Sequence, residues 1–163
     1  MTTSAAPLPA APLASDAGLT DLLQAFRQMQ LQHGRVIVHE SEALSMGATD
    51  IRALFFIASG NSDGATPKQV AEFLELSTGA TTSLVDRLVN AGTLVRQAHP
   101  TDRRSVVLHV TEAGQDAVRH VADVYRCALS TAIPESAYTE MAALFRSIAL
   151  ALTEGSGCFS TEK

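Results

Sequence analysis

Apolar side chains recur at helical spacing over most of the chain, and this pattern predicts the secondary structure. A first helix over 19–44 carries apolar residues three and four positions apart, beginning with Leu19, Leu22 and Leu23. Thr49 is expected to cap a second helix over 50–59. Its inward face is expected to hold Ile51, Leu54, Phe55 and Ala58. The glycine-rich stretch 60–64 then predicts a loop.

Two short helices with clear boundary signals follow. Thr66 is a capping residue and Pro67 suits a first helical position, so a helix is predicted over 67–74. Ser77 caps the next helix, which is expected to run to residue 91 and to end at Gly92. The buried face of this helix should carry four side chains, namely Ala80 or Thr81, Leu84, Val85 and Leu88.

Two strand-like runs, 94–98 and 105–110, flank a polar turn that contains Asp102, Arg103 and Arg104. A β-hairpin with a cationic tip fits the minor groove of DNA, where the negative potential is concentrated. The helix pair upstream fits the major groove. The predicted fold class is therefore mainly α: a winged helix-turn-helix with a two-stranded β-hairpin wing and N- and C-terminal dimerisation helices.

The pattern also predicts the domain limits. Residues 1–17 are rich in Ala and Pro and are expected to form a disordered arm, and 154–163 a flexible tail. One domain is expected over 18–153, with a winged core over about 49–110. The helices over 19–44 and 112–153 carry more apolar surface than that core needs. They form either ordinary core or a two-fold dimer interface, and the dimer is favoured.

Composition narrows the class of protein. The chain has 163 residues and is 46% hydrophobic, but it contains no apolar run near the ~20 residues of a membrane span, so we expect a soluble protein that does not enter a membrane. The N-terminus has no signal-peptide pattern. Two cysteines, Cys127 and Cys158, form no disulfide framework, which favours the cytoplasm.

The net charge of −5 is unusual for a DNA-binding protein, but its distribution is uneven. Residues 66–110 carry five Lys and Arg against four Asp and Glu, so the remaining chain carries −6. The acidic residues therefore lie mostly outside the predicted DNA face. Non-specific binding to DNA should be weak and should fall steeply with salt.

The segment 66–114 resembles the MarR (multiple antibiotic resistance regulator) family of bacterial transcription regulators. The resemblance is carried by Pro67–Leu74, by Ser77 through Gly92, by Leu94-Val95-Arg96, by Asp102-Arg103-Arg104 and by 108–114. It implies that the helix over 77–91 lies in the major groove of double-stranded DNA. The DNA-binding residues implied there are Thr78, Gly79, Thr82, Ser83 and Arg87. In the wing, Arg103 and Arg104 are implied to contact DNA, with Asp102 orienting Arg104.

The chain departs from the family pattern at two positions of this helix. The family often has a branched aliphatic residue and a basic residue where this sequence has Thr81 and Ser83. Short hydroxyl side chains discriminate bases less than an arginine does, so more of the specificity is expected in the wing and in DNA shape. Arg96 is either a phosphate contact or a support for the hairpin, and support is favoured.

The resemblance further implies a homodimer on a pseudo-palindromic operator, acting as a repressor that a small molecule releases. An aromatic or phenolic ligand would bind in a cleft lined by Phe26, His33, Ile37 and Phe55. No catalytic residue, cofactor or metal ligand is assigned, because the chain has no Gly-x-Ser-x-Gly, phosphate-loop or metalloprotease motif. We therefore expect that it is not an enzyme.

Three alternatives stay open at this point. A thiol-responsive regulator would use Cys127 or Cys158. A metal-responsive regulator would use donors such as His39, Glu40, Glu42, His120 and Asp123, which have no regular spacing. A winged-helix adaptor for protein partners, without DNA binding, would account for the acidic net charge and the neutral helix. The cationic wing argues against the adaptor.

Overall fold

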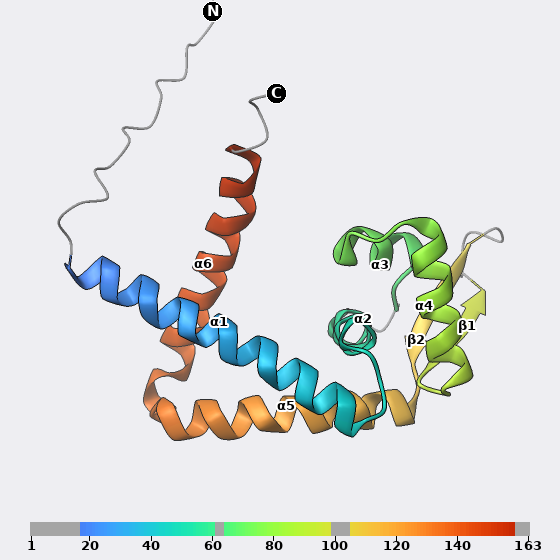
Figure 1. Cartoon of the computed structure of the whole chain (residues 1–163), viewed down its shortest axis with the longest axis horizontal. Coiled ribbons are helices and arrows are strands. Elements are labelled where there is room, and N and C mark those ends of the chain that lie inside the picture. The colour runs from blue at the N-terminus through green and yellow to red at the C-terminus, as the bar shows by residue number, and fades with distance from the viewer. Residues whose placement is uncertain (1–16, 61–63, 99–104, 159–163) are drawn as a thin grey trace, which may run out of the picture. The chain divides into compact units, whose positions relative to one another are not determined.

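A computed structural model describes residues 17–60, 64–98 and 105–158 of the chain. The chain divides into two compact units, Met1–Ile51 and Arg52–Lys163. The described part contains six α-helices and one antiparallel pair of strands, β1 and β2, in the order that Figure 1 labels. No helix within the described ranges is long and apolar enough to cross a membrane.

The first unit consists of α1, Ala17–Ala43, and the start of α2, Ala48–Ser59. Helix α1 continues through Gly34, and of its residues only Ile37 and Ser41 are buried. Helix α2 begins before Thr49, so the predicted cap at Thr49 is wrong. The physical reason is that the N–H of Gly47 donates to Asp50 Oδ2 at 3.0 Å, while the Gly47 carbonyl accepts from the N–H of Asp50.

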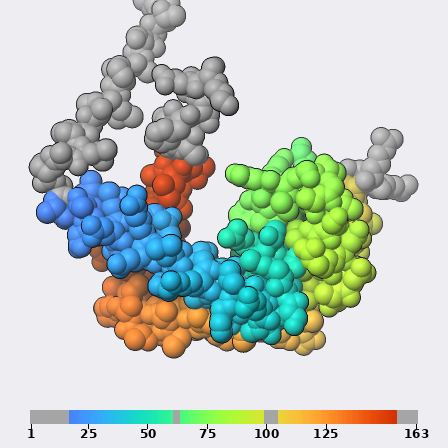
Figure 2. Space-filling view, in the orientation of Figure 1, coloured from blue at the N-terminus to red at the C-terminus, as the bar shows by residue number. Residues whose placement is uncertain are grey.

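The second unit contains the rest of α2, then α3, Pro67–Leu74, α4, Thr78–Asn90, and the hairpin of β1, Leu94–Ala98, and β2, Val106–Val110. Helix α4 packs against α3 and β1, and Figures 1 and 2 show these green and yellow segments as one body. From α2 the core takes Ala53, Leu54 and Ile57, whereas Ala58 is exposed, contrary to the prediction. The core also includes Val70, Leu84, Val85, Leu88, Leu94, Val107 and Leu108.

Capping residues fix both helices of the pair at the predicted positions. The Thr66 side chain accepts from the N–H of Gln69, whose side chain accepts from the N–H of Thr66, which completes a capping box with Pro67 in the first turn. Ser77 caps α4 by accepting from the N–H of Ala80. Gly92 follows α4 with φ of 72°, the left-handed conformation that glycine adopts without strain.

The hairpin pairs five residues of each strand, from Leu94 opposite Val110 to Ala98 opposite Val106. Ala65 forms an additional bridge with Leu108, so the segment before α3 is also tied to β2. The connection between the strands, 99–104, lies outside the described residues. Strand β2 therefore pairs with two segments, with β1 and with Ala65, which lies shortly before α3.

Helix α5, Glu112–Ala132, is followed by a 3-10 turn, Glu135–Ala137, and by α6, Tyr138–Cys158. Helix α6 extends beyond residue 153, where the sequence predicts the last helix to end. The tail has no proline, and its glycines alone did not end the helix. A mostly apolar groove of about 280 Å³ lies between the end of α5 and the start of α6, and its lining includes Leu129, Ile133, Tyr138, Met141 and Phe145.

Candidate nucleic-acid interface

Helix α4 separates its residues cleanly into a buried and an exposed face. Thr81, Leu84, Val85 and Leu88 are buried, which selects Thr81 over Ala80 for the inward position. The residues assigned to DNA, Thr78, Gly79, Thr82, Ser83 and Arg87, are all exposed. One face of α4 therefore brings these five residues together, and packing of the opposite face holds them in place.

Small side chains make the exposed face of α4 shallow over its first two turns. A Cβ atom added at Gly79 would meet no atom within 4 Å, so this position is open. The Thr82 hydroxyl donates to the carbonyl of Thr78 at 2.9 Å, and that of Ser83 donates to the carbonyl of Gly79 at 3.1 Å. Both side chains are thus folded back along the helix, and a surface that docks here could approach the backbone closely.

An ion pair joins the second half of α4 to the hairpin. Arg96 Nη2 on β1 donates to Asp86 Oδ1 on α4 at 2.5 Å. This contact favours support of the hairpin as the role of Arg96. Sequence reasoning missed Asp86 as its partner, because the two residues are ten positions apart and lie on different kinds of element. Both side chains are partly exposed, so the pair fixes orientation more than it adds stability.

The remaining predicted residues are distributed over the chain. Asp102, Arg103 and Arg104 lie outside the described residues. Phe26, His33 and Ile37 are on α1 in the first unit, where Ile37 is buried and His33 exposed, and half-buried Phe55 is on α2 in the second unit. The assignment of these four residues to an effector cleft stays a prediction.

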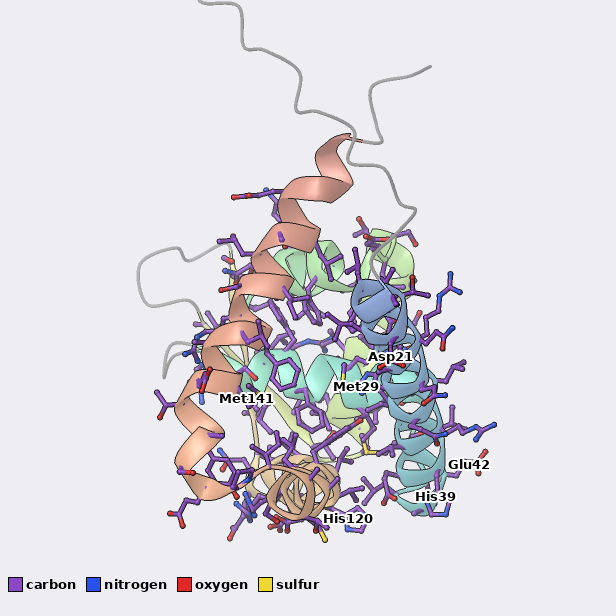
Figure 3. The ribbon with its side chains drawn as sticks, turned by 90° about the vertical axis from the view of Figure 1, so that its left-hand side faces the viewer. Asp21, Met29, His39, Glu42, His120 and Met141 are labelled. Atoms are coloured by element: carbon purple, nitrogen blue, oxygen red, sulfur yellow. The ribbon has the colours of Figure 1, made fainter. Side chains whose placement is uncertain are left out.

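The metal-responsive and thiol-responsive alternatives depend on where their candidate side chains lie. His39 and Glu42 lie near the C-terminal end of α1 (Figure 3), and His39 Nδ1 is 3.0 Å from Glu40 Oε1. Asp123 is paired with Arg126 on α5. Over the described ranges, no three His, Cys, Asp or Glu side chains are grouped to hold a metal ion. The Cys127 thiol is free and exposed on α5.

Taken together, α3, the turn to α4, α4 and the antiparallel hairpin form a winged helix-turn-helix fold, as the sequence predicts. Residues 44–105 match the model of the MarR family. This segment covers 62 of the 163 residues, so the chain resembles the MarR family over its winged helix-turn-helix region.

The chain is also similar to individual known proteins. The chain is 31% identical over 106 residues to the uncharacterized HTH-type transcriptional regulator YcgE of Bacillus subtilis (strain 168), and the match spans 64% of this chain and 64% of YcgE. Its fold is similar to that of the S. aureus MepR–DNA complex, with a TM-score of 0.57 and 16% identity over 79% of this chain and 98% of that chain. It is also similar to wild-type MarR from E. coli in the apo form, with a TM-score of 0.57 and 20% identity over 78% of this chain and 96% of that chain.

Proposed function

We propose that this protein is a transcription regulator that binds double-stranded DNA through α4 and the wing. The observation that carries the proposal is the exposed face of α4, which presents Thr78, Gly79, Thr82, Ser83 and Arg87 beside a hairpin tied to the same helix. An exposed, capped helix next to a β-hairpin suits simultaneous contact with a major and a minor groove. A similar fold occurs in the MepR–DNA complex, which supports the proposal.

The protein acts as a homodimer on a pseudo-palindromic operator, with half-sites about 10 base pairs apart. Exposed apolar side chains support the dimer: on α6 they include Leu144, Phe145, Leu150 and Leu152, and on α1 they include Leu22 and Leu31. Two copies of α4, a helix with little charge, also bind DNA more tightly than one copy, because the second contact becomes intramolecular. Its location is the cytoplasm, and repression is its role at the operator.

A small aromatic or phenolic effector releases the dimer from DNA. Phe26, His33, Ile37 and Phe55 are the residues proposed to line its site. The test is titration of a panel of phenolic carboxylates into the protein–DNA complex, followed by fluorescence anisotropy of labelled DNA. Release at micromolar to millimolar concentration that the Phe26→Ala variant abolishes is the expected result, and release that is unchanged in this variant would contradict the assignment.

The DNA-binding proposal is tested by anisotropy of the full chain on labelled DNA from the region upstream of its own gene, and on random DNA of equal length. We expect tighter binding to the upstream DNA and a linear fall of log K with log salt. Arg104→Ala should weaken binding about tenfold and reduce the salt slope by about one for each protomer. Arg119→Ala is the matched control, because Arg119 lies on α5 and pairs with Asp116.

A second candidate function is that of an adaptor for protein partners, which the net charge of −5 favours. The same experiment separates the two functions. An adaptor would bind upstream and random DNA equally weakly, and Arg104→Ala and Arg119→Ala would behave alike. That result, repeated on a pool of randomised duplexes, would reject the regulator.

A further inference from the structure

Two hydroxyl groups on the exposed face of α4, those of Thr82 and Ser83, already donate their hydrogen atoms within the helix. Thr82 Oγ1 donates to the Thr78 carbonyl and Ser83 Oγ donates to the Gly79 carbonyl, at 2.9 and 3.1 Å. A hydroxyl has one O–H donor and two acceptor lone pairs. What Thr82 and Ser83 present outward is therefore an acceptor oxygen each and, from Thr82, a methyl group.

The first two turns of α4 contain no long donor side chain that could compensate. Residues 78–85 contain no Arg, Lys, Asn, Gln or His. The first cationic side chain is Arg87, one turn beyond Ser83, and the neighbouring Asp86 is paired with Arg96. The exposed surface around Thr82 is thus rich in acceptors and methyl groups, and it is neutral.

Base edges in the major groove differ in what they offer to such a surface. Guanine presents two acceptors, N7 and O6, which repel an acceptor oxygen. Adenine and cytosine present an amino donor, and thymine alone presents a methyl group. Only the A·T pair combines an amino donor with a methyl group, so it alone complements both groups of Thr82.

We infer that α4 selects A·T over G·C at the base pair that Thr82 contacts, with Thr82 as the specificity-determining residue. This inference rests on the proposed DNA-binding function. The Thr82 oxygen accepts from the adenine N6 amino group, and its methyl group packs against the thymine methyl. A G·C pair fits less well: guanine would require the hydroxyl to give up its bond to the helix carbonyl, and cytosine offers an amino group but no methyl group to pack against Thr82.

The first experiment is selection of bound duplexes from a randomised pool by the full chain, followed by sequencing. We expect an enriched two-fold motif with A·T pairs at the centre of each half-site. Replacing one of these pairs with G·C should lower affinity on the order of tenfold in anisotropy. A motif with guanine at these positions would overturn the inference while leaving DNA binding intact, whereas a pool without any enrichment would overturn both.

Matched changes on both sides of the contact then isolate Thr82. Replacing the contacted thymine with deoxyuridine removes only the methyl group, and replacing adenine with purine removes only the amino group. Wild type should lose several-fold in affinity with each. Thr82→Ser keeps the acceptor and should become insensitive to deoxyuridine, and Thr82→Val keeps the methyl group and should become insensitive to purine.

The two variants differ from wild type by one group on an exposed residue, so both are expected to fold, and far-UV circular dichroism checks this. Equal sensitivity of wild type and both variants to the two base changes would overturn the role of Thr82. Ser83→Lys adds a long donor at the neighbouring position. In the selection it should shift one enriched base pair of each half-site toward guanine, and an unchanged motif would also count against the inference.

Discussion

At the scale of single residues, Gly114 occupies a position that leaves no room for a side chain. A Cβ atom there would lie 2.2 Å from the carbonyl oxygen of Thr93 and 2.6 Å from Cγ1 of Val110. The first of these atoms belongs to the backbone, so no side-chain rotation can relieve the clash. Absence of a side chain at Gly114 is what lets the first turn of α5 lie against the start of the hairpin.

Gly114→Ala should therefore destabilise the protein by about 1–3 kcal/mol, because the backbone of one element has to move. Gly34→Ala is the matched control: it lies within α1, a Cβ there would meet no atom within 4 Å, and it should stabilise the protein by about 0.5–1 kcal/mol. Urea denaturation followed by circular dichroism measures both. Equal effects of the two substitutions would contradict the close approach at Gly114.

At the scale of elements, one junction holds α4, β1 and α5 together. The Thr111 hydroxyl donates to the carbonyl of Gly92, which follows α4, at 2.7 Å and accepts from the N–H of Gly114 as the cap of α5. Thr93, between α4 and β1, donates from its hydroxyl to the carbonyl of Leu88 and accepts from the N–H of Thr111. The hairpin and α4 are thus fixed relative to each other at the junction where α4, β1 and α5 meet.

Thr111→Val keeps the shape of the side chain but removes both hydrogen bonds of the hydroxyl. We expect it to lower the free energy of unfolding by about 1–2 kcal/mol, in the range of a lost helix cap. Thr111→Ser keeps the hydroxyl and should cost less than half as much. The midpoints of urea unfolding measure the stability of the two variants. A valine variant as stable as the serine variant would show that the hydrogen bonds of the Thr111 hydroxyl do not stabilise the junction.

The elements differ in how far the sequence could predict them. Helices α3 and α4 begin where predicted, because Thr66 and Ser77 cap them through local hydrogen bonds that sequence spacing encodes. The start of α2 was missed, because the side chain that holds it, Asp50, reaches back to Gly47 from inside the helix. The Arg96–Asp86 pair was also missed, since it depends on tertiary packing. Asp102, Arg103 and Arg104 stay predictions.

At the scale of the whole molecule, the described helices leave much apolar surface uncovered in a single chain. Phe145 is 44% exposed and lines the groove between α5 and α6 together with Tyr138, which is 41% exposed. Exposed apolar groups of this size, gathered around a groove, are typical of surfaces that associate. A second copy of the chain is the occupant that the proposed operator symmetry requires.

Phe145→Asp should convert the dimer to a monomer, because it places a charge in the surface that the dimer buries. Light scattering after size-exclusion chromatography should give twice the chain mass of 17.2 kDa for wild type and the single mass for the variant. Phe73→Asp introduces the same change at an exposed phenylalanine of α3 and should remain dimeric. A monomeric wild type, or a dimeric Phe145→Asp variant, would reject this interface.

A tyrosine that lines the groove between α5 and α6 can report self-association through its fluorescence. The chain contains no tryptophan and two tyrosines, Tyr125 and Tyr138, and Tyr138 lines the groove. Intrinsic ultraviolet emission therefore comes from tyrosine alone, and half of its emitters belong to α5 and half to α6. Association of two copies would change the polarity around one of these two phenols. Emission followed on dilution can thus report self-association without any attached dye.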